Sequence, residues 1–193
     1  MDILFSDSIR CALLAKIIQI YNDNKETGKP TGYLSRTVLQ KLCYFAVSKG
    51  VPLGYDFEIY HFGPFDKTIY FDVESLIADE VIMDASPQEK YSYYIPGPNV
   101  AALINRYAKE ISKFEGDIRE IVTMFDELGP YEMEIVATVH YVYKSRTGLG
   151  ARGASDESII SDVYKLKGHK FKKEVVEKTL SIIKRTRLVG WAN

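Results

Sequence analysis

Lysine and arginine residues gather near the C-terminal end of the chain. Between Lys165 and Arg187 there are nine basic and two acidic residues, a net charge of +7 in a chain whose overall formal charge is -1. Clustered basic side chains bind nucleic acid by displacing the counterions of its phosphate groups. The pattern predicts a DNA-binding surface made of Lys165, Lys167, Lys170, Lys172, Lys173, Lys184, Arg185 and Arg187. The alternative is a solvated helix face, because surface helices are commonly rich in lysine.

A glycine pattern at residues 148–153 matches the G-x-G-x-x-G signature of dinucleotide-binding loops. In such a site the first glycine directly follows a strand of a parallel sheet. Here Tyr143 to Thr147 separate the first glycine from the β-branched segment before it, and no parallel-sheet pattern surrounds the motif. We expect a loop without a cofactor, whose basic neighbours could contact phosphate through charge alone.

The histidines and cysteines form no pattern that predicts catalysis or metal binding. His61, His140 and His169 lie in separate segments, and none is followed at close spacing by a second metal ligand. Cys11 and Cys43 fall within apolar helical patterns, which predicts small core residues in a reducing compartment. We therefore expect a non-enzymatic protein without metal or cofactor.

Composition indicates a globular cytoplasmic protein. The chain is 46% hydrophobic and 26% charged, which is enough apolar material for one larger domain or two small ones. No apolar run approaches the roughly 20 residues of a membrane span, and the first residues lack the positive region of a signal peptide. We expect no membrane partner.

The first 97 residues predict three helices and a hairpin. Ser6 is the expected N-cap of the first helix and Ser35 of the second, and Asp66 is expected to cap the third. The alternating, aromatic-rich segment 56–62 predicts a short strand before a sharp turn at Gly63 and Pro64. Segments 81–83 and 91–95 predict a β-hairpin, so the order of elements is that of a winged helix.

The second strand of this hairpin carries several tyrosines. Tyr91, Tyr93 and Ile95 share one face of the strand, which could cover the core or, alternatively, stack on nucleic-acid bases. We favour the core, because burying aromatic area is the commoner use of an inner strand face.

Residues 98–129 show the most regular apolar spacing in the chain. Spacings of four and three alternate through Val100, Ile104, Tyr107, Ile111, Phe114, Ile118, Ile121, Phe125 and Leu128. This heptad pattern predicts either one long helix, which could form a homodimer through residues 100–128, or two shorter helices broken near Gly116 and packed within the monomer. We favour internal packing, since tertiary contacts supply most helical stability.

Residues 130–193 predict a helical part that resembles a helix-turn-helix. Tyr131 to Tyr143 is nearly all apolar and predicts a buried central helix. Ser155 or Asp156 is the expected cap of the next helix, and Lys172 opens a basic amphipathic one. The expected fold is therefore mainly α with a small antiparallel β-sheet: a winged-helix-like part (1–97), a heptad helix or helix pair (98–129) and a helix-turn-helix-like part (130–193).

The second helix and the aromatic turn carry a family resemblance. Lys41 and Tyr44 belong to a Lys-Leu-x-Tyr motif in the predicted second helix. Phe62, Gly63 and Pro64 follow this motif as an aromatic-Gly-Pro turn. In these motifs the chain resembles the YwgA-type predicted transcriptional regulators and, more distantly, the SocA-like (Panacea) antitoxin domain. The resemblance implies a structural or partner-binding role for Lys41, Tyr44, Tyr60, His61, Phe62, Gly63, Pro64, Phe65 and Asp66.

Two functions follow as hypotheses. The order of elements and the basic segment favour a winged-helix transcriptional regulator that binds DNA. The aromatic Gly-Pro region and the resemblance favour a protein-interaction module, of the antitoxin or proteolytic-adaptor type, whose partner is a toxin or a protease substrate.

Overall fold

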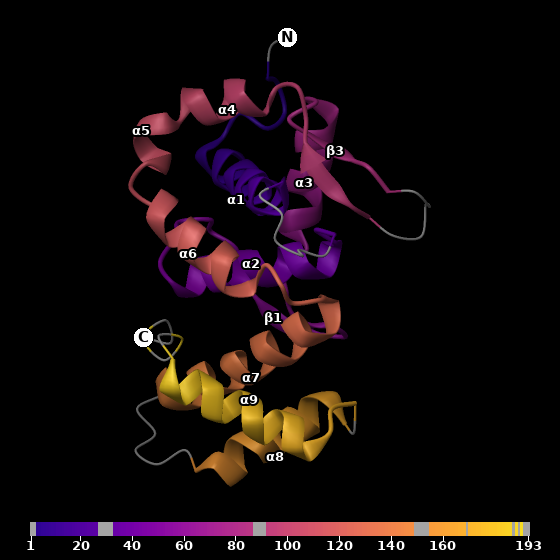
Figure 1. The fold of residues 1–193 in the computed structure, drawn as a ribbon, viewed down its shortest axis with the longest axis vertical. Helices are drawn as coiled ribbons and strands as arrows, with labels where there is room; N and C mark the ends of the chain where they lie inside the picture. Colours follow the sequence, from indigo (N-terminus) through magenta and orange to yellow (C-terminus); the bar gives the residue numbers. More distant parts are fainter. Residues whose placement is uncertain are drawn as a thin grey trace.

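The computed structural model describes residues 3–26, 33–86, 92–148, 155–168, 170–186, 188 and 190. Within these ranges the chain is mainly helical (Figure 1), as predicted. The helices are α1 (Ile9–Glu26), α2 (Arg36–Ser48), α3 (Thr68–Ala78), α4 (Val100–Arg106), α5 (Ala108–Ile111), α6 (Glu115–Phe125), α7 (Pro130–Gly148), α8 (Asp156–Lys167) and α9 (Lys173–Arg185).

In the part of the chain that the structure describes, the β structure consists of two separate antiparallel hairpins. β1 (Glu58–Tyr60) pairs with β2 (Gly63–Phe65), and β3 (Ile82–Asp84) pairs with β4 (Tyr94–Pro96). The first hairpin precedes α3 in the chain and the second follows it. No strand of one pairs with a strand of the other, so they do not form the one small sheet that we expected. The sharp turn also lies at His61 and Phe62, while Gly63 and Pro64 belong to β2.

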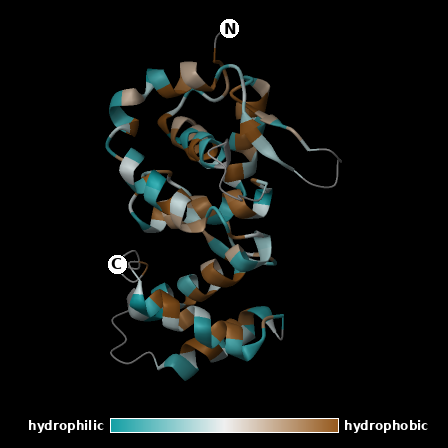
Figure 2. Ribbon diagram, in the orientation of Figure 1, coloured by the Kyte–Doolittle hydropathy of each residue, from teal (hydrophilic) through white to brown (hydrophobic). Residues whose placement is uncertain are grey.

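Helix α1 is the centre of the N-terminal two thirds of the molecule. It packs against α2, α3, α4, α5, α6 and β4, and its side chains from Cys11 to Ala15 are all buried. Figure 1 shows α1 enclosed by these elements, and Figure 2 shows hydrophobic residues on the helix faces that point inward. A helix that is apolar on nearly every side must lie in the interior.

Helix α7 is the second hub. It contacts α2 and β2 on one side and α8 and α9 on the other. Its residues Met133, Ala137, Val139 and Val142 are buried, as the predicted central helix requires. In Figure 1 the three C-terminal helices lie together at the end of the molecule opposite the N-terminus, with β1 near the junction.

The heptad segment is broken into three helices, so the single long helix was wrong. The breaks lie at Tyr107 and at residues 112–114, whereas Gly116 lies inside α6. Leu103, Ile111 and Ile118 are buried, and α4, α5 and α6 all pack on α1. The apolar stripe must bend around α1 to do this, which a straight helix cannot. The helices of this segment pack within the monomer, as the favoured alternative predicted.

Two local predictions are also corrected. The hydroxyl of Ser6 donates to Asp79 (2.8 Å), and it is the Ser8 hydroxyl that accepts a hydrogen bond from the first turn of α1. In the second hairpin Tyr94 is 3% exposed, so the core face of β4 is the opposite of the predicted Tyr93 and Ile95 face. Tyr91 lies outside the described residues.

Other caps are confirmed. Ser35 accepts from the backbone N–H of Val38, and Ser155 accepts from that of Ser158. The Asp66 carboxylate accepts from the backbone N–H of Thr68 (2.7 Å), so it serves the first turn of α3 although the helix formally begins after Lys67.

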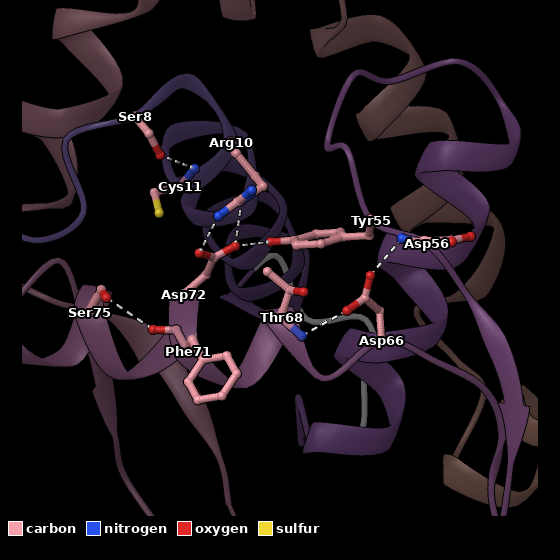
Figure 3. A network of polar contacts seen from close by, with 10 residues as sticks. All are labelled: Ser8, Arg10, Cys11, Tyr55, Asp56, Asp66, Thr68, Phe71, Asp72 and Ser75. Carbon is pink, nitrogen blue, oxygen red and sulfur yellow. Dashed lines mark hydrogen bonds and ion pairs between the residues drawn. The ribbon is translucent and has the colours of Figure 1, made fainter.

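A buried carboxylate ties α3 to α1. Asp72 accepts two hydrogen bonds from the guanidinium of Arg10 (2.7 and 3.0 Å) and a third from the hydroxyl of Tyr55 (2.8 Å), as Figure 3 shows. A buried charge is tolerated when it is paired and fully hydrogen-bonded. This network fixes the loop between α2 and β1 and therefore the position from which the first hairpin starts.

None of the helices in the described ranges combines the length and the apolar character of a membrane span.

Candidate functional site

The β1–β2 hairpin is pressed against α2 and α7 at a glycine. Gly63 has φ +89°, a conformation that favours glycine. A Cβ atom at this position would lie 2.9 Å from the Thr138 hydroxyl and 3.3 Å from the Lys41 side chain. The hairpin can therefore sit this close to both helices only because residue 63 has no side chain.

Two consecutive residues of α2 bond to the backbone of the hairpin. The ammonium of Lys41, in a residue that is 1% exposed, donates to the carbonyl of Pro64 (2.9 Å). The amide of Gln40 donates to the carbonyl of Asp66 (2.9 Å) and accepts from its backbone N–H (3.1 Å). Asp66 also accepts from the backbone N–H of Asp56 (2.5 Å), visible in Figure 3, which closes the base of the hairpin.

The end of α8 binds the turn of the hairpin. Lys167 donates to the carbonyls of Tyr60 (2.9 Å) and His61 (2.7 Å) and to the carboxylate of Glu134 (3.0 Å). Lys170 donates to both oxygens of Glu134 at 2.7 Å. The side chains of Lys167 and Glu134 are each 3% exposed. We call Lys41, Glu134, Lys167 and Lys170 the clasp, because they hold the hairpin between α2, α7 and α8.

The clasp places one carboxylate among three amines. Burial lowers the pKa of Lys41 to about 7; the Glu134 charge opposes this shift, and Lys167 and Lys170 add to it. Burial also lowers the pKa of Lys167, and its hydrogen bond with Glu134 works in the opposite direction. The Thr138 hydroxyl, beside Gly63, is buried with no hydrogen-bond partner in the described part of the chain. The clasp therefore holds the hairpin firmly in place and carries a net positive charge.

On the outer side, the hairpin displays aromatic rings. Tyr60 and Phe62 are each 59% exposed, and Tyr70 on α3 is 36% exposed. The ring of Phe65 lies between Tyr60 and Tyr70, with centroid distances of 5.5 and 5.3 Å. The Lys170 ammonium lies 4.7 Å from the centroid of Phe62, a cation–π contact. We call Tyr60, Phe62, Phe65 and Tyr70 the aromatic surface.

An open groove of about 410 Å³ runs between this surface and the start of α2. It is lined by Arg36, Thr37, Gln40, Lys41, Tyr60, His61, Phe62, Phe65, Lys67 and Tyr70. Among these described residues none is acidic. The size falls within the range of pockets that bind small molecules or side chains.

A neighbouring groove, which shares Tyr60, Phe65 and Lys67 with the first, has the opposite character. It is about 470 Å³, and its lining includes Asp56, Glu58 and Asp66. A basic groove and an acidic one therefore adjoin at the hairpin.

The basic residues of the C-terminal segment are largely paired with acids. Lys165 bonds to Asp162 (2.9 Å) and Lys184 to Asp156 (2.7 Å). Lys173 lies 3.7 Å from Glu177. Lys172 and Arg185 are exposed, and Arg187 lies outside the described residues.

A groove between α8 and α9 carries acidic residues beside these lysines. Asp156, Glu157 and Glu177 line it together with Lys173. The predicted DNA-binding residues that the structure describes thus divide: Lys167 and Lys170 belong to the clasp, and the others lie on a face of mixed charge.

The residues that carry the family resemblance lie close together, with two different tasks. Lys41, Gly63, Pro64 and Asp66 fix the hairpin, whereas Tyr60, Phe62 and Phe65 form the outer surface. Tyr44 lies deeper: its hydroxyl and the Nδ1 atom of His140 are 2.7 Å apart, and His140 Nε2 donates to the carbonyl of Leu188 (3.1 Å). The side chain of His61 is exposed and packs on Tyr60, with ring centroids 4.4 Å apart.

Sequence reasoning missed several residues of this site: Arg36, Thr37, Gln40, Lys67, Tyr70, Glu134 and Thr138. The available signal was Glu134, a carboxylate within a helix that is otherwise nearly all apolar, because a buried acid requires a basic partner. Arg36, Lys67 and Tyr70 had no such signal, since exposed polar and aromatic residues are common on any surface.

Within the described ranges, no cluster of three or more His, Cys, Asp or Glu side chains is placed to hold a metal ion. Of the glycine motif at 148–153, the residues after Gly148 lie outside the described ranges.

A scan against protein-family models finds no match to the chain, and a search of curated proteins finds none either.

Proposed function

We propose that this chain is a non-enzymatic regulatory protein that acts by binding a partner protein through the aromatic surface of the β1–β2 hairpin. The observation that carries the proposal is the exposure of Tyr60 and Phe62, each 59%, on a hairpin that is otherwise firmly anchored. Aromatic side chains dominate the energetic centres of protein interfaces. The same hairpin contains the aromatic-Gly-Pro turn of the SocA-like and YwgA-type resemblance.

The anchoring supports binding because it reduces the entropy that is lost on association. Lys41, Gln40 and Lys167 bond to five backbone groups of the hairpin or its base, namely those of Tyr60, His61, Pro64 and both groups of Asp66. A surface held in its bound conformation converts more of its contact energy into affinity. A loop whose only role was to connect two elements would not require this support.

A winged-helix regulator that binds DNA is the second candidate. The observation in its favour is the exposed basic face of α9, with Lys172, Lys178 and Arg185. Against it stand Asp156 and Glu177 along the groove beside α9, because acidic side chains repel phosphate. The loss of Lys167 and Lys170 to the clasp weakens the candidate further.

The test compares three variants as bait in affinity capture from the source cells, with quantitative mass spectrometry. Tyr60→Ser combined with Phe62→Ser removes the exposed rings. Lys172→Glu combined with Lys173→Glu and Arg185→Glu reverses the basic face. Met124→Ser, at a side chain 38% exposed on α6, is the matched surface control.

We expect a stoichiometric partner with the wild type, the α9 variant and the control, and its loss of at least tenfold with the hairpin variant. A partner that all four proteins retain would contradict the proposal. In parallel, fluorescence anisotropy with a labelled 30-base-pair duplex tests the second candidate. Salt-dependent binding that disappears only in the α9 variant would favour DNA.

A further inference from the structure

The two grooves beside the hairpin differ in charge, and this difference restricts what can lie across the aromatic surface. The groove toward α2 has Arg36, Lys41 and Lys67 in its lining, whereas the neighbouring groove, which shares Lys67 with it, has Asp56, Glu58 and Asp66. A segment bound in the basic groove would lie beside the cations Arg36 and Lys67. Its apolar groups would contact the rings of Tyr60, Phe65 and Tyr70.

We propose that the basic groove binds a peptide segment of the partner in which a carboxylate side chain lies within a few residues of an aromatic or aliphatic one. This inference rests on the proposed function and specifies the chemistry of its partner.

Arg36 is the group best placed to bind the carboxylate. Its guanidinium lies 5.7 Å from the centroid of the Tyr70 ring and its Nε donates to the Tyr94 hydroxyl (3.3 Å), so it is oriented before any ligand arrives. An oriented guanidinium pairs with a carboxylate through two parallel hydrogen bonds. Arg36 also opens α2, where the helix dipole favours negative charge.

Lys67 adds a second charge and the rings supply the apolar wall. Lys67 is exposed and lies in the lining of both grooves, next to Asp66 in the chain. The Lys41 amine is bonded to the carbonyl of Pro64 inside the wall, so it makes no direct contact with the bound segment. Phe65, half buried between Tyr60 and Tyr70, completes a surface for an aromatic or aliphatic side chain.

The same charges disfavour a nucleic-acid strand at this place. A strand needs a continuous track of cations along its phosphates. A polyanion that extends from the basic groove into the neighbouring one would reach Asp56 and Glu58, which would repel it. A peptide with one or two acids near an apolar residue has no such conflict.

The test is selection from a phage-displayed library of random dodecapeptides, followed by fluorescence anisotropy with the selected peptides. The immobilised proteins are the wild type, an Arg36→Gln/Lys67→Gln variant and a Lys172→Gln/Lys178→Gln variant. The last removes two exposed charges from α9 and is the matched control. Thermal unfolding checks that all three are folded.

We expect the wild type and the control to enrich peptides with Asp or Glu within three residues of Phe, Trp, Tyr, Leu or Ile. The Arg36→Gln/Lys67→Gln variant should bind them at least tenfold more weakly, and sodium chloride should weaken binding to the wild type more than to this variant. Absence of an acidic consensus, or equal binding by the variant, overturns the inference. The inference is also overturned if the wild type binds an oligothymidylate more tightly than the best peptide and Arg36→Gln abolishes binding of the oligothymidylate.

These outcomes are separable from failure of the proposed function. If the cellular partner is lost with Tyr60→Ser/Phe62→Ser but kept with Arg36→Gln/Lys67→Gln, the proposed function holds and the carboxylate inference falls. If the partner is kept with both variants, the proposed function itself is wrong.

Discussion

Lysine is used in opposite ways in the clasp and on α9. In the clasp, Lys41 and Lys167 are almost completely buried and bond to backbone carbonyls. On α9, Lys173 and Lys184 are exposed, and their acidic partners are exposed too. The first set supports the hairpin, whereas the second set covers a helix that buries its apolar side.

The comparison shows why a count of charges along the chain does not locate a binding surface. Lys167 and Lys170 add to the +7 of the C-terminal segment, but both are bonded to Glu134 and unable to offer their full charge to DNA. The cations with the strongest structural role include Lys41, which lies outside that segment in the largely apolar helix α2. Position relative to the core decides the role of a lysine.

The largest contrast should appear when an acid is removed from each region. Glu134→Gln leaves the buried Lys167 ammonium without its counter-charge, and we expect a loss of about 3 kcal/mol in the free energy of unfolding. Glu177→Gln removes the exposed partner of Lys173 and should cost less than about 0.5 kcal/mol. Urea denaturation followed by circular dichroism measures both.

Equal losses in the two variants would mean that the clasp is no more than a surface ion pair. A loss in Glu134→Gln that vanishes when Lys167→Met is added would support the account, because the unpaired charge is then gone.

Glycine provides a second, smaller contrast. Gly63→Ala places a Cβ atom 2.9 Å from the Thr138 hydroxyl at a residue with φ +89°, so it combines a clash with backbone strain. Gly168→Ala, at φ +57° with no atom within 4 Å of the new Cβ, has strain alone. We expect losses of about 2 and about 1 kcal/mol, respectively. Equal midpoints of chemical denaturation would show that the hairpin can move away from α7.

The pH dependence of stability should single out Lys41. The folded chain holds its pKa near 7, against an ordinary value of 10.5, so between these values the unfolded state binds more protons. Stability therefore rises with pH in this window. The cost of burying the protonated Lys41 amine is fully present below pH 7 and is absent above pH 10.5. Between pH 7 and pH 8 the contribution is about 1 kcal/mol.

The check is the difference in unfolding free energy between the wild type and Lys41→Met, which should grow in favour of the wild type as pH rises. Glu134, Lys167 and Lys170 face Lys41 from α7 and the end of α8, and they are present in both proteins. Lys172→Met, on the exposed start of α9, should leave the pH profile unchanged. A constant difference between wild type and Lys41→Met would contradict the lowered pKa.

Much of the fold could be predicted from local patterns, and the site only in part. The caps Ser35 and Ser155 and the apolar spacing predicted helices α2, α7, α8 and α9, because caps and periodicity are local. The bend of residues 100–128 around α1 could not be predicted, since it depends on the shape of a distant helix. The partners of Gly63, namely Lys41 and Thr138, lie 22 residues before it and 75 residues after it in the chain, a proximity that no local pattern encodes.

The smallest predicted effect connects the clasp with the aromatic surface. The Lys170 ammonium lies over the ring of Phe62, and such a contact at an exposed site is worth about 0.5 kcal/mol. Phe62→Leu keeps an apolar side chain but removes the ring, while Lys170→Met removes the charge. Because Lys170 also bonds to Glu134, only the coupling term of the double-mutant cycle reports the ring contact.

We expect a coupling of about 0.5 kcal/mol between Phe62→Leu and Lys170→Met in urea denaturation. Phe71→Leu, at an α3 ring that is 62% exposed, serves as the control and should show no coupling with Lys170→Met. A coupling of zero at Phe62 as well would mean that the ring is held by the backbone of the turn alone. The lysines of the C-terminal segment would then support the aromatic surface only through the clasp.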